Sequence, residues 1–341
     1  MMDISVPYYE DKTRISNSNI GWFLNKGPAF LYKMLTEDVP EEKSPALERG
    51  TMIHMYILQP EEFQKDYVVW DKSRPTSPQQ EAFCRELANT LEIEPNRAIL
   101  SAYKASYSTK GKSDDVMLSE GLKIASTLKD YIDFLKEDSG RIMISHWDYQ
   151  NLKNIKDKIE NHKLAKKIIW PHTDPENYRK DEPIIENWHE FHINWEWYGE
   201  MPVACKSLLD GLTLDFKNKK ATIYDLKTTQ KLWHFEDSVE QYDYLRQLMY
   251  YRFATEWYLE YERGEKSPQS EWTFEFYIIG IDTTGMCEVR VFSFTEDDFI
   301  KDHIGWKIGH ALEDIAWHQA NNKWDHSREY YEGDGSESLN L

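Results

Sequence analysis

Strict alternation of side-chain character over residues 189–197 is the feature that most constrains the fold of this chain. His189, Phe191, Ile193, Trp195 and Trp197 alternate with the polar residues Glu190, His192, Asn194 and Glu196. A period of two residues is typical of a β-strand with one buried face. Two more strands are predicted after short turns, at residues 203–210 and 221–227. The middle of the chain is therefore expected to form a three-stranded meander.

Helical patterns surround this meander. Helices are predicted over residues 15–35, with a break at Gly27-Pro28, and over 44–59, 120–136, 146–169, 237–262 and 296–321. Strands are predicted at 272–281 and 288–294, while the polar segment 72–115 is expected to be irregular. This order indicates an α/β or α+β fold in which helices pack on a sheet.

One elaborated domain is expected over residues 1–324. Its helical part covers about 15–170 and its sheet core about 184–321. The acidic segment 325–341 is expected to be a disordered tail.

Composition limits the class of protein. The 341-residue chain is long enough for a substantial core and has no apolar run of about 18 residues that could cross a membrane. Its N-terminus lacks the basic and apolar stretches of a secretion signal. Three cysteines, Cys84, Cys205 and Cys287, are too few for a four-cysteine zinc or Fe–S site. We therefore expect a reduced cytoplasmic protein without membrane contact or an Fe–S cluster.

The net charge of -19 opposes a nucleic-acid partner, because DNA affinity comes largely from lysine and arginine. The tail accounts for only -4 of this charge, so the body is acidic too. Two interpretations remain: an acidic exterior with a locally basic channel, or no DNA binding. Lysines that could line such a channel are Lys217, Lys219 and Lys220 in a turn, and Lys153, Lys156, Lys158, Lys163, Lys166 and Lys167 on a predicted helix. The alternative for the second group is a solvated helix face.

The predicted strand at residues 221–229 contains the most informative chemistry. Successive strand side chains point to opposite faces, so Asp225 and Lys227 share one face and Leu226 points the other way. This pair suits a metal-dependent phosphodiesterase, because the carboxylate holds a divalent cation and the lysine positions water or offsets negative charge. The Leu226 carbonyl could add an oxygen ligand. An Asp-x-Lys tripeptide also occurs by chance, so its companions decide its meaning.

Suitable companions are present. Asp210 ends the preceding strand, and paired strands would bring it and Asp225 to one cation. The alternative for Asp210 is an ordinary Asp-Gly turn. His54 lies on an apolar helix face, where a hydrogen-bonded core histidine is the alternative. Gln247 and Tyr251, four residues apart on one helix face, could contact a phosphate or base edge or could be plain helix surface.

These motifs together resemble the PD-(D/E)XK nuclease superfamily, RecB-like branch, and most closely the phage exonuclease VIII (RecE-like) group. The matching elements, in order, are Gly50-x-x-x-His54, Asp210, Asp225-Leu226-Lys227 and Gln247-x-x-x-Tyr251. The segments at residues 15–18, 46–63 and 223–229 are similar to that group as well. The likeness covers residues 15–294 and implies a central mixed β-sheet flanked by helices, with an N-terminal helical region.

The resemblance also implies roles for individual residues. The implied metal ligands are His54, Asp210, Asp225 and the Leu226 backbone carbonyl, with Mg²⁺ or Mn²⁺ as the cofactor. The implied catalytic residues are Asp210, Asp225 and Lys227. The implied supporting or DNA-contacting residues are Gln247, Tyr251, Glu190 and Lys206. No phosphate-binding loop is present, so no nucleotide cofactor is expected.

The function that the resemblance implies is a metal-dependent deoxyribonuclease, a 5′→3′ exonuclease on linear double-stranded DNA in phage-type recombination. It further implies a ring-shaped homo-oligomer, a single-strand annealing partner protein, and a phage or prophage gene expressed in the bacterial cytoplasm. An endonuclease on the same scaffold is one alternative. A non-catalytic acidic DNA mimic or binding module is the other, and the -19 charge motivates it.

Overall fold

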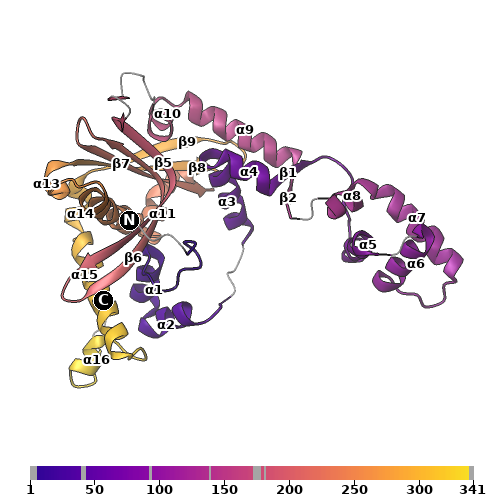
Figure 1. Ribbon diagram of the computed structural model, residues 1–341, viewed down its shortest axis with the longest axis horizontal. Helices are drawn as coiled ribbons and strands as arrows, with labels where there is room; N and C mark the ends of the chain where they lie inside the picture. The colour runs from indigo at the N-terminus through magenta and orange to yellow at the C-terminus, as the bar shows by residue number, and fades with distance from the viewer. Residues whose placement is uncertain are drawn as a thin grey trace. The chain divides into compact units, whose positions relative to one another are not determined.

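The chain folds into two compact units, Met1–Gln59 with Lys153–Leu341, and Pro60–Leu152. The computed structural model describes residues 6–39, 44–91, 94–137, 140–171, 178–179 and 182–337 (Figure 1). The sequence pattern had indicated a single domain with its helical part in one piece. The second unit instead has its own hydrophobic core and is inserted between Gln59 and Lys153 of the larger unit.

The larger unit is built around a five-stranded sheet in the order β5-β6-β7-β8-β9. Its strands are β5 Ile185–Tyr198, β6 Pro202–Asp215, β7 Lys220–Thr229, β8 Thr273–Asp282 and β9 Val289–Phe294. The β7–β8 pair is parallel, and the other three pairs are antiparallel. The expected central mixed sheet flanked by helices is therefore confirmed, with the Asp225 strand at its middle.

Helices account for most of the remaining chain in this unit. They are α1 Asn17–Lys26, α2 Pro28–Thr36, α3 Pro45–Leu58, α10 Lys163–Ile169, α11 Phe235–Gln241, α12 Tyr244–Trp257, α13 Pro268–Glu271, α14 Glu296–Lys301, α15 Ile304–Asn321 and α16 Arg328–Glu332. A 3₁₀-helix, η2 Leu232–His234, precedes α11, and a π-helical segment, η3 Tyr258–Glu262, follows α12. The helix α9 His146–Asn161 has residues in both units.

Two helix boundaries follow from local sequence. The break predicted at Gly27-Pro28 separates α1 from α2, and Gly27 has φ 83°, a conformation that favours glycine. The Ser44 side chain accepts a hydrogen bond from the Leu47 amide and caps α3, with Pro45 in the first turn. The start of α3 is thus set by its own residues, which fixes the turn of helix on which His54 lies.

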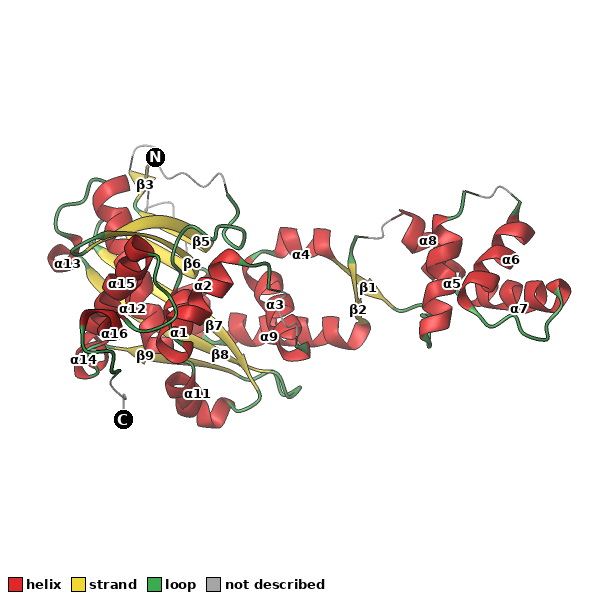
Figure 2. Cartoon of the chain, turned by 90° about the horizontal axis from the view of Figure 1, so that it is seen from below, coloured by secondary structure: helices red, strands yellow, loops and turns green. Residues whose placement is uncertain are grey.

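One face of the sheet is covered by α12, which packs across β5, β6 and β7, while α15 lies beside α12 (Figure 2). The Trp195 ring on β5 meets the Tyr250 ring on α12 with centroids 5.0 Å apart. Both side chains are buried. Burial of large aromatic rings gives this layer much of its hydrophobic stabilisation.

The alternation predicted for β5 breaks at Glu190. The Trp188 and Phe191 rings stack at 4.8 Å, and both meet the Tyr258 ring, at 6.2 and 5.2 Å. Residues three apart in a regular strand would point to opposite faces, so the strand switches faces between them. Glu190 has φ 50°, which produces the switch. His189 consequently does not share the face of Phe191, and its ring nitrogens lie 3.1 and 2.9 Å from carbonyl oxygens at the ends of α3 and α10.

The acidic segment after residue 324 was expected to be disordered, but its described part to residue 337 contains α16. The Tyr331 ring packs against Trp317 of α15 at 5.6 Å, and Arg328 lies 3.6 Å from Asp314. Aromatic packing thus orders a segment whose charge alone suggested disorder.

The second unit, residues 60–152, is mainly helical. Its elements are α4 Pro60–Asp66, β1 Tyr67–Trp70, α5 Pro78–Asn89, α6 Pro95–Ser106, α7 Asp114–Thr127, α8 Lys129–Glu137, β2 Ile142–Ser145 and the start of α9. The expectation of irregular structure at 72–115 is wrong, because α5 and α6 bury Phe83, Cys84 and Tyr103 in a separate core. β1 and β2 pair as a parallel ribbon.

In the part of the chain that the structure describes, no helix is long and apolar enough to span a bilayer.

Candidate active site

The site forms where the strands β6 and β7 separate. Their paired register ends at Gly211 opposite Tyr224. At the next position the Asp210 side chain replaces the backbone as partner, and its Oδ2 accepts a hydrogen bond from the Leu226 amide at 2.7 Å. Beyond this fork the backbone of Ile15 takes the place of β7 beside β6. The fork leaves the carboxylate of Asp210 facing the strand that carries Asp225 and Lys227.

Three possible metal ligands meet at the fork. One ligand atom each from His54, Glu190 and Asp210 lie within 4.8 Å of one another. His54 reaches the cluster from α3, with its Nδ1 3.5 Å from Asp210 Oδ2. Side chains from α3, β5 and β6 therefore converge on one small volume, although they are far apart in the sequence.

Glu190 lies opposite Asp210 across the β5–β6 ladder, as the neighbouring pairs His189–Gly211 and Phe191–Leu209 show. Like charges directly opposite in a sheet repel. Burial, followed by the charges of Asp210 and Asp225, raises the pKa of Glu190 to about 8. The positive φ of Glu190 adds backbone strain of the kind that is found at functional sites. A bound cation would relieve the carboxylate repulsion.

Asp225 and Lys227 form the second half of the site. Lys227 Nζ lies 2.6 Å from Asp225 Oδ2, and Gln247 Nε2 donates to Asp225 Oδ1 at 2.9 Å. Gln247 Nε2 also donates to the Tyr251 hydroxyl oxygen at 2.8 Å. Tyr251 therefore helps to hold the Gln247 amide against Asp225. Burial and then the charge of Asp210 raise the pKa of Asp225 to about 7, against the lowering effect of Lys227. Burial lowers the pKa of Lys227, but the Asp225 and Asp210 charges raise it more.

The donor set fits a divalent cation. Burial lowers the pKa of His54 despite the opposing charge of Asp210, so its imidazole is neutral near pH 7 and able to ligate. Two carboxylates with one imidazole match Mn²⁺ well, whereas Mg²⁺ prefers oxygen ligands alone. Glu190, expected as a supporting residue, meets His54 and Asp210 in this cluster, and Asp225 contacts Lys227 and Gln247 beside it. The role of Asp225 as a metal ligand stays a prediction. The role of the Leu226 carbonyl as a ligand stays a prediction.

Lys206, predicted to be a supporting or DNA-contacting residue, lies inside the protein. Its side chain is buried, and Nζ donates to the backbone carbonyls of Tyr8, at 2.6 Å, and of Asp11. The ammonium also lies 4.6 Å from the Tyr8 ring centroid. Lys206 therefore links the N-terminal segment to β6, because its ammonium group donates hydrogen bonds to backbone carbonyls of that segment.

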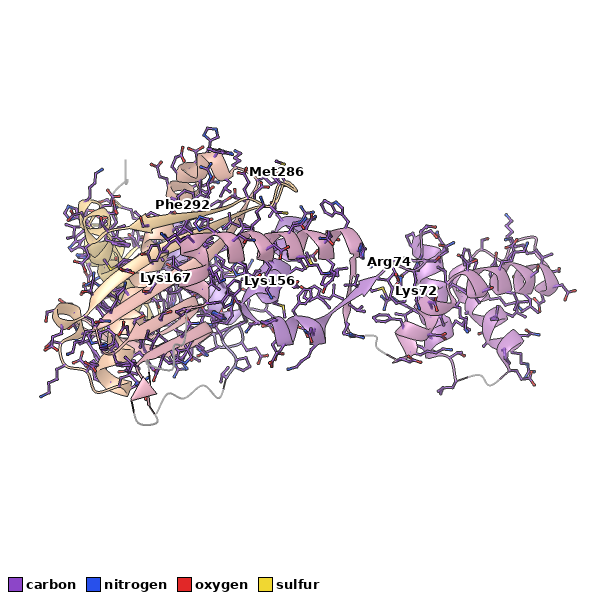
Figure 3. The ribbon with its side chains drawn as sticks, turned by 90° about the horizontal axis from the view of Figure 1, so that it is seen from above. Lys72, Arg74, Lys156, Lys167, Met286 and Phe292 are labelled. Atoms are coloured by element: carbon purple, nitrogen blue, oxygen red, sulfur yellow. The ribbon has the colours of Figure 1, made fainter. Side chains whose placement is uncertain are left out.

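The two predicted lysine groups differ in the structure. Lys219 contacts Glu271 and Lys220 lies 2.7 Å from Glu275, so neighbouring acids offset the turn cluster. The lysines of α9 and α10 are mostly exposed, and Figure 3 labels Lys156 and Lys167 among them. A DNA-facing role for these helices stays a prediction.

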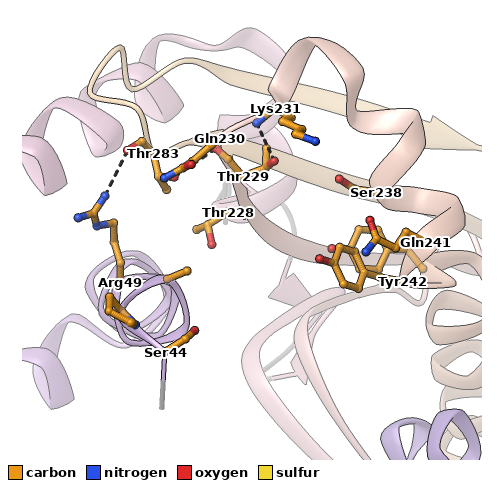
Figure 4. A pocket seen from close by; sticks show the side chains of 13 residues that line it. Ser44, Arg49, Thr228, Thr229, Gln230, Lys231, Ser238, Gln241, Tyr242 and Thr283 are labelled. Atoms are coloured by element: carbon orange, nitrogen blue, oxygen red, sulfur yellow. Dashed lines mark hydrogen bonds between the residues drawn. The ribbon is translucent and has the colours of Figure 1, made fainter. Parts of the chain in front are cut away.

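A cavity of about 590 Å³ adjoins the site at the end of β7 (Figure 4). Its lining includes Thr228, which directly follows the catalytic lysine candidate, and Tyr244, whose ring centroid lies 4.9 Å from Lys227 Nζ. Arg49 on α3 and Lys231 after β7 supply positive charge. The lining of this cavity thus combines cationic and hydroxyl groups, which are groups that can bind phosphate.

Sequence reasoning missed two contributors. Tyr244 lies three residues before Gln247, so helical spacing with Gln247 and Tyr251 could have indicated it. Tyr224 is buried, and its hydroxyl has no hydrogen-bond partner among the described residues. Burial and the charges of Asp210 and Glu190 raise its pKa well above the ordinary value. A cross-strand partner of Gly211 cannot be recognised before the strand register is known.

The sheet order and the Asp-x-Lys pair on the middle strand define a PDDEXK-like fold. The model of a family described as "PDDEXK-like domain of unknown function (DUF3799)" matches residues 16–330, and the chain belongs to this family. A crystal structure from Eubacterium rectale described as a "Putative exonuclease" is similar at 14% identity and TM-score 0.46, over 96% of this chain and 90% of that chain. No curated protein matches the chain significantly.

Proposed function

We propose that this protein is a divalent-metal-dependent deoxyribonuclease that degrades linear double-stranded DNA from its 5′ ends. The observation that supports this most is the convergence of His54, Glu190 and Asp210 within 4.8 Å, next to the ion pair between the buried Asp225 and the partly exposed Lys227. Membership of a PDDEXK-like family agrees with nuclease chemistry. The 5′→3′ direction, phage-type recombination and a RecE-like relationship rest on the sequence resemblance alone.

The residues of the site would have different roles in phosphodiester hydrolysis. His54, Glu190 and Asp210 would hold the cation, with Asp225 beside them. A divalent cation supplies Lewis-acid chemistry, because it lowers the pKa of a water and offsets charge on phosphate. Lys227, charged at neutral pH beside Asp225, orients a water or stabilises the negative charge that develops on the phosphate. Gln247 fixes the Asp225 carboxylate for this geometry.

An acidic protein needs a confined route for DNA. Arg49 and Lys231 at the cavity beside Lys227 provide local positive charge there. A ring-shaped homo-oligomer with a central channel would concentrate such charge inside, and a single-strand annealing protein would take up the product strand. We further propose that the protein is encoded by a phage or prophage gene and acts in the bacterial cytoplasm.

The test compares linear duplex DNA, labelled at either the 5′ or the 3′ end, with covalently closed circles in Mg²⁺ or Mn²⁺. We expect degradation of the linear DNA only, with early release of the 5′ label. Cleavage of closed circles would instead identify the endonuclease alternative. Binding without any hydrolysis would identify the non-catalytic alternative.

A further inference from the structure

The second unit contains a cavity that the hydrolytic site does not use. Its volume is about 300 Å³, at the small end of ligand pockets. Three arginines from different places in the unit line it. Arg74 follows β1, Arg85 is on α5, and Arg141 directly precedes β2. Residues far apart in the sequence thus bring three guanidinium groups to one pocket.

Among the described residues that line this pocket, arginines outnumber acids. Among the described residues that line it, Glu81 is the only acid. Its carboxylate lies 2.6 Å from Arg85 Nε and accepts hydrogen bonds from the Tyr131 hydroxyl at 2.7 and 2.9 Å. Glu81 is therefore already satisfied. Arg74, which is labelled in Figure 3, is exposed, and it forms no ion pair within the described part of the chain.

Aromatic rings form another wall of the pocket. Tyr131 and Phe134 of α8 line it, and Trp70 of β1 packs behind them with ring centroids 6.2 and 5.3 Å away. Packed rings resist rearrangement and make this wall apolar. Guanidinium groups bind phosphate through paired hydrogen bonds, and aromatic faces stack on bases.

We propose that this pocket binds a backbone phosphate of a DNA strand and makes the second unit a DNA-binding element. The choice of DNA among phosphate-bearing ligands rests on the proposed nuclease function. The pocket is too small for a folded partner, but a strand can pass its phosphates one at a time. This contact would supply affinity that the acidic body of the protein lacks.

The test measures DNA binding by the full chain with fluorescence anisotropy in EDTA, so that hydrolysis does not interfere. Short labelled single-stranded and duplex oligonucleotides are the probes, and a labelled polyglutamate peptide tests for an acidic protein ligand. Arg74→Ala should weaken DNA binding about tenfold and reduce the salt dependence by about one charge. Arg74→Lys keeps the positive charge but loses the planar guanidinium group with its paired donors. This variant should show an intermediate loss of DNA affinity.

Arg97→Ala is the matched control, because Arg97 is exposed in the same unit, 3.7 Å from Glu94 and outside the pocket. It should change affinity less than about twofold. Unchanged DNA binding in Arg74→Ala, an equal loss in Arg97→Ala, or a loss confined to the polyglutamate probe would each overturn the proposal. If Arg74→Ala weakens DNA binding but the wild-type protein does not hydrolyse DNA, the nuclease function is wrong and the DNA-binding pocket stands.

Discussion

The Leu226 amide donates a hydrogen bond to Asp210 Oδ2 at 2.7 Å, at the point where the ladder between β6 and β7 ends. One side-chain oxygen thus substitutes for a strand partner and sets the position of the carboxylate. The same oxygen lies 3.5 Å from His54 Nδ1. Movement of the Asp225–Lys227 strand would therefore displace the metal-ligand candidates as well.

Lys227 is predicted to act on the reaction without holding the cation. Lys227→Met should lower the hydrolysis rate by about 100-fold or more, because a charge at the developing phosphate is lost. Mn²⁺ affinity should not fall, since one positive charge leaves the neighbourhood of the ligands. Lys301→Met, at an exposed position on α14, is the control and should leave both quantities unchanged. Equal rates for wild type and Lys227→Met would exclude this role.

His54 is predicted to be a ligand. His54→Gln should weaken Mn²⁺ binding by about 10–100-fold or more, measured by calorimetry. Excess Mn²⁺ should restore part of the activity, because the carboxylates remain. His310→Gln, an exposed position on α15, provides the comparison. A variant at His54 with wild-type Mn²⁺ affinity would show that the histidine is an ordinary core residue.

Glu190 is predicted to cost stability in the metal-free protein. Its folded pKa of about 8 lies above the unfolded value of about 4.3, so its stabilising contribution is complete below about pH 4 and is lost as the pH rises through about 8. Glu190→Gln removes this loss. The variant should be more stable than wild type by about 1 kcal/mol or more at high pH, which raises Tm by about 2–4 °C.

Thermal unfolding in EDTA at about pH 5 and about pH 9 measures this effect. The difference between variant and wild type should grow with pH, and added Mn²⁺ should stabilise the wild type more than the variant. A difference that shrinks with rising pH would mean that Glu190 is not crowded by Asp210 and Asp225.

Gly211 is predicted to be intolerant of any side chain. A Cβ there would lie 2.0 Å from the Tyr224 ring, so Gly211→Ala must displace the ring or the strand beside Asp210. Such overpacking costs about 1–3 kcal/mol in the free energy of unfolding, measured with urea. Hydrolysis should fall too. Gly140→Ala, where no atom lies within 4 Å of the added Cβ, should have an effect within about 0.5 kcal/mol.

Much of the fold was predictable because its signals are local. The Gly27-Pro28 break, the Ser44 cap and the strands predicted at residues 203–210 and 221–227 each depend on neighbouring residues, and the structure confirms them. The polar segment 72–115 misled because α5 and α6 have narrow apolar faces, which bury only a few residues each. A separate core for that region could not be inferred from its composition.

The sequence predicted which residues belong to the site better than it predicted how they are arranged. His54, Asp210 and Glu190 were named in advance, but their meeting depends on the face switch at Glu190. Strand periodicity cannot reveal a single residue with positive φ. The surroundings of Lys206 could not be predicted, because its partners are backbone carbonyls of a distant segment, which no sequence pattern encodes.

The most direct test of the central claim is metal-dependent hydrolysis of end-labelled linear duplex by wild type and by Asp225→Asn. The substitution keeps the side-chain shape but removes the charge beside Lys227. Asp237→Asn, exposed on α11, is the matched control. We predict Mn²⁺- or Mg²⁺-dependent degradation by wild type and control, and a loss of about 100-fold or more in Asp225→Asn. Full activity of Asp225→Asn, or wild-type hydrolysis that persists in EDTA, would contradict the account.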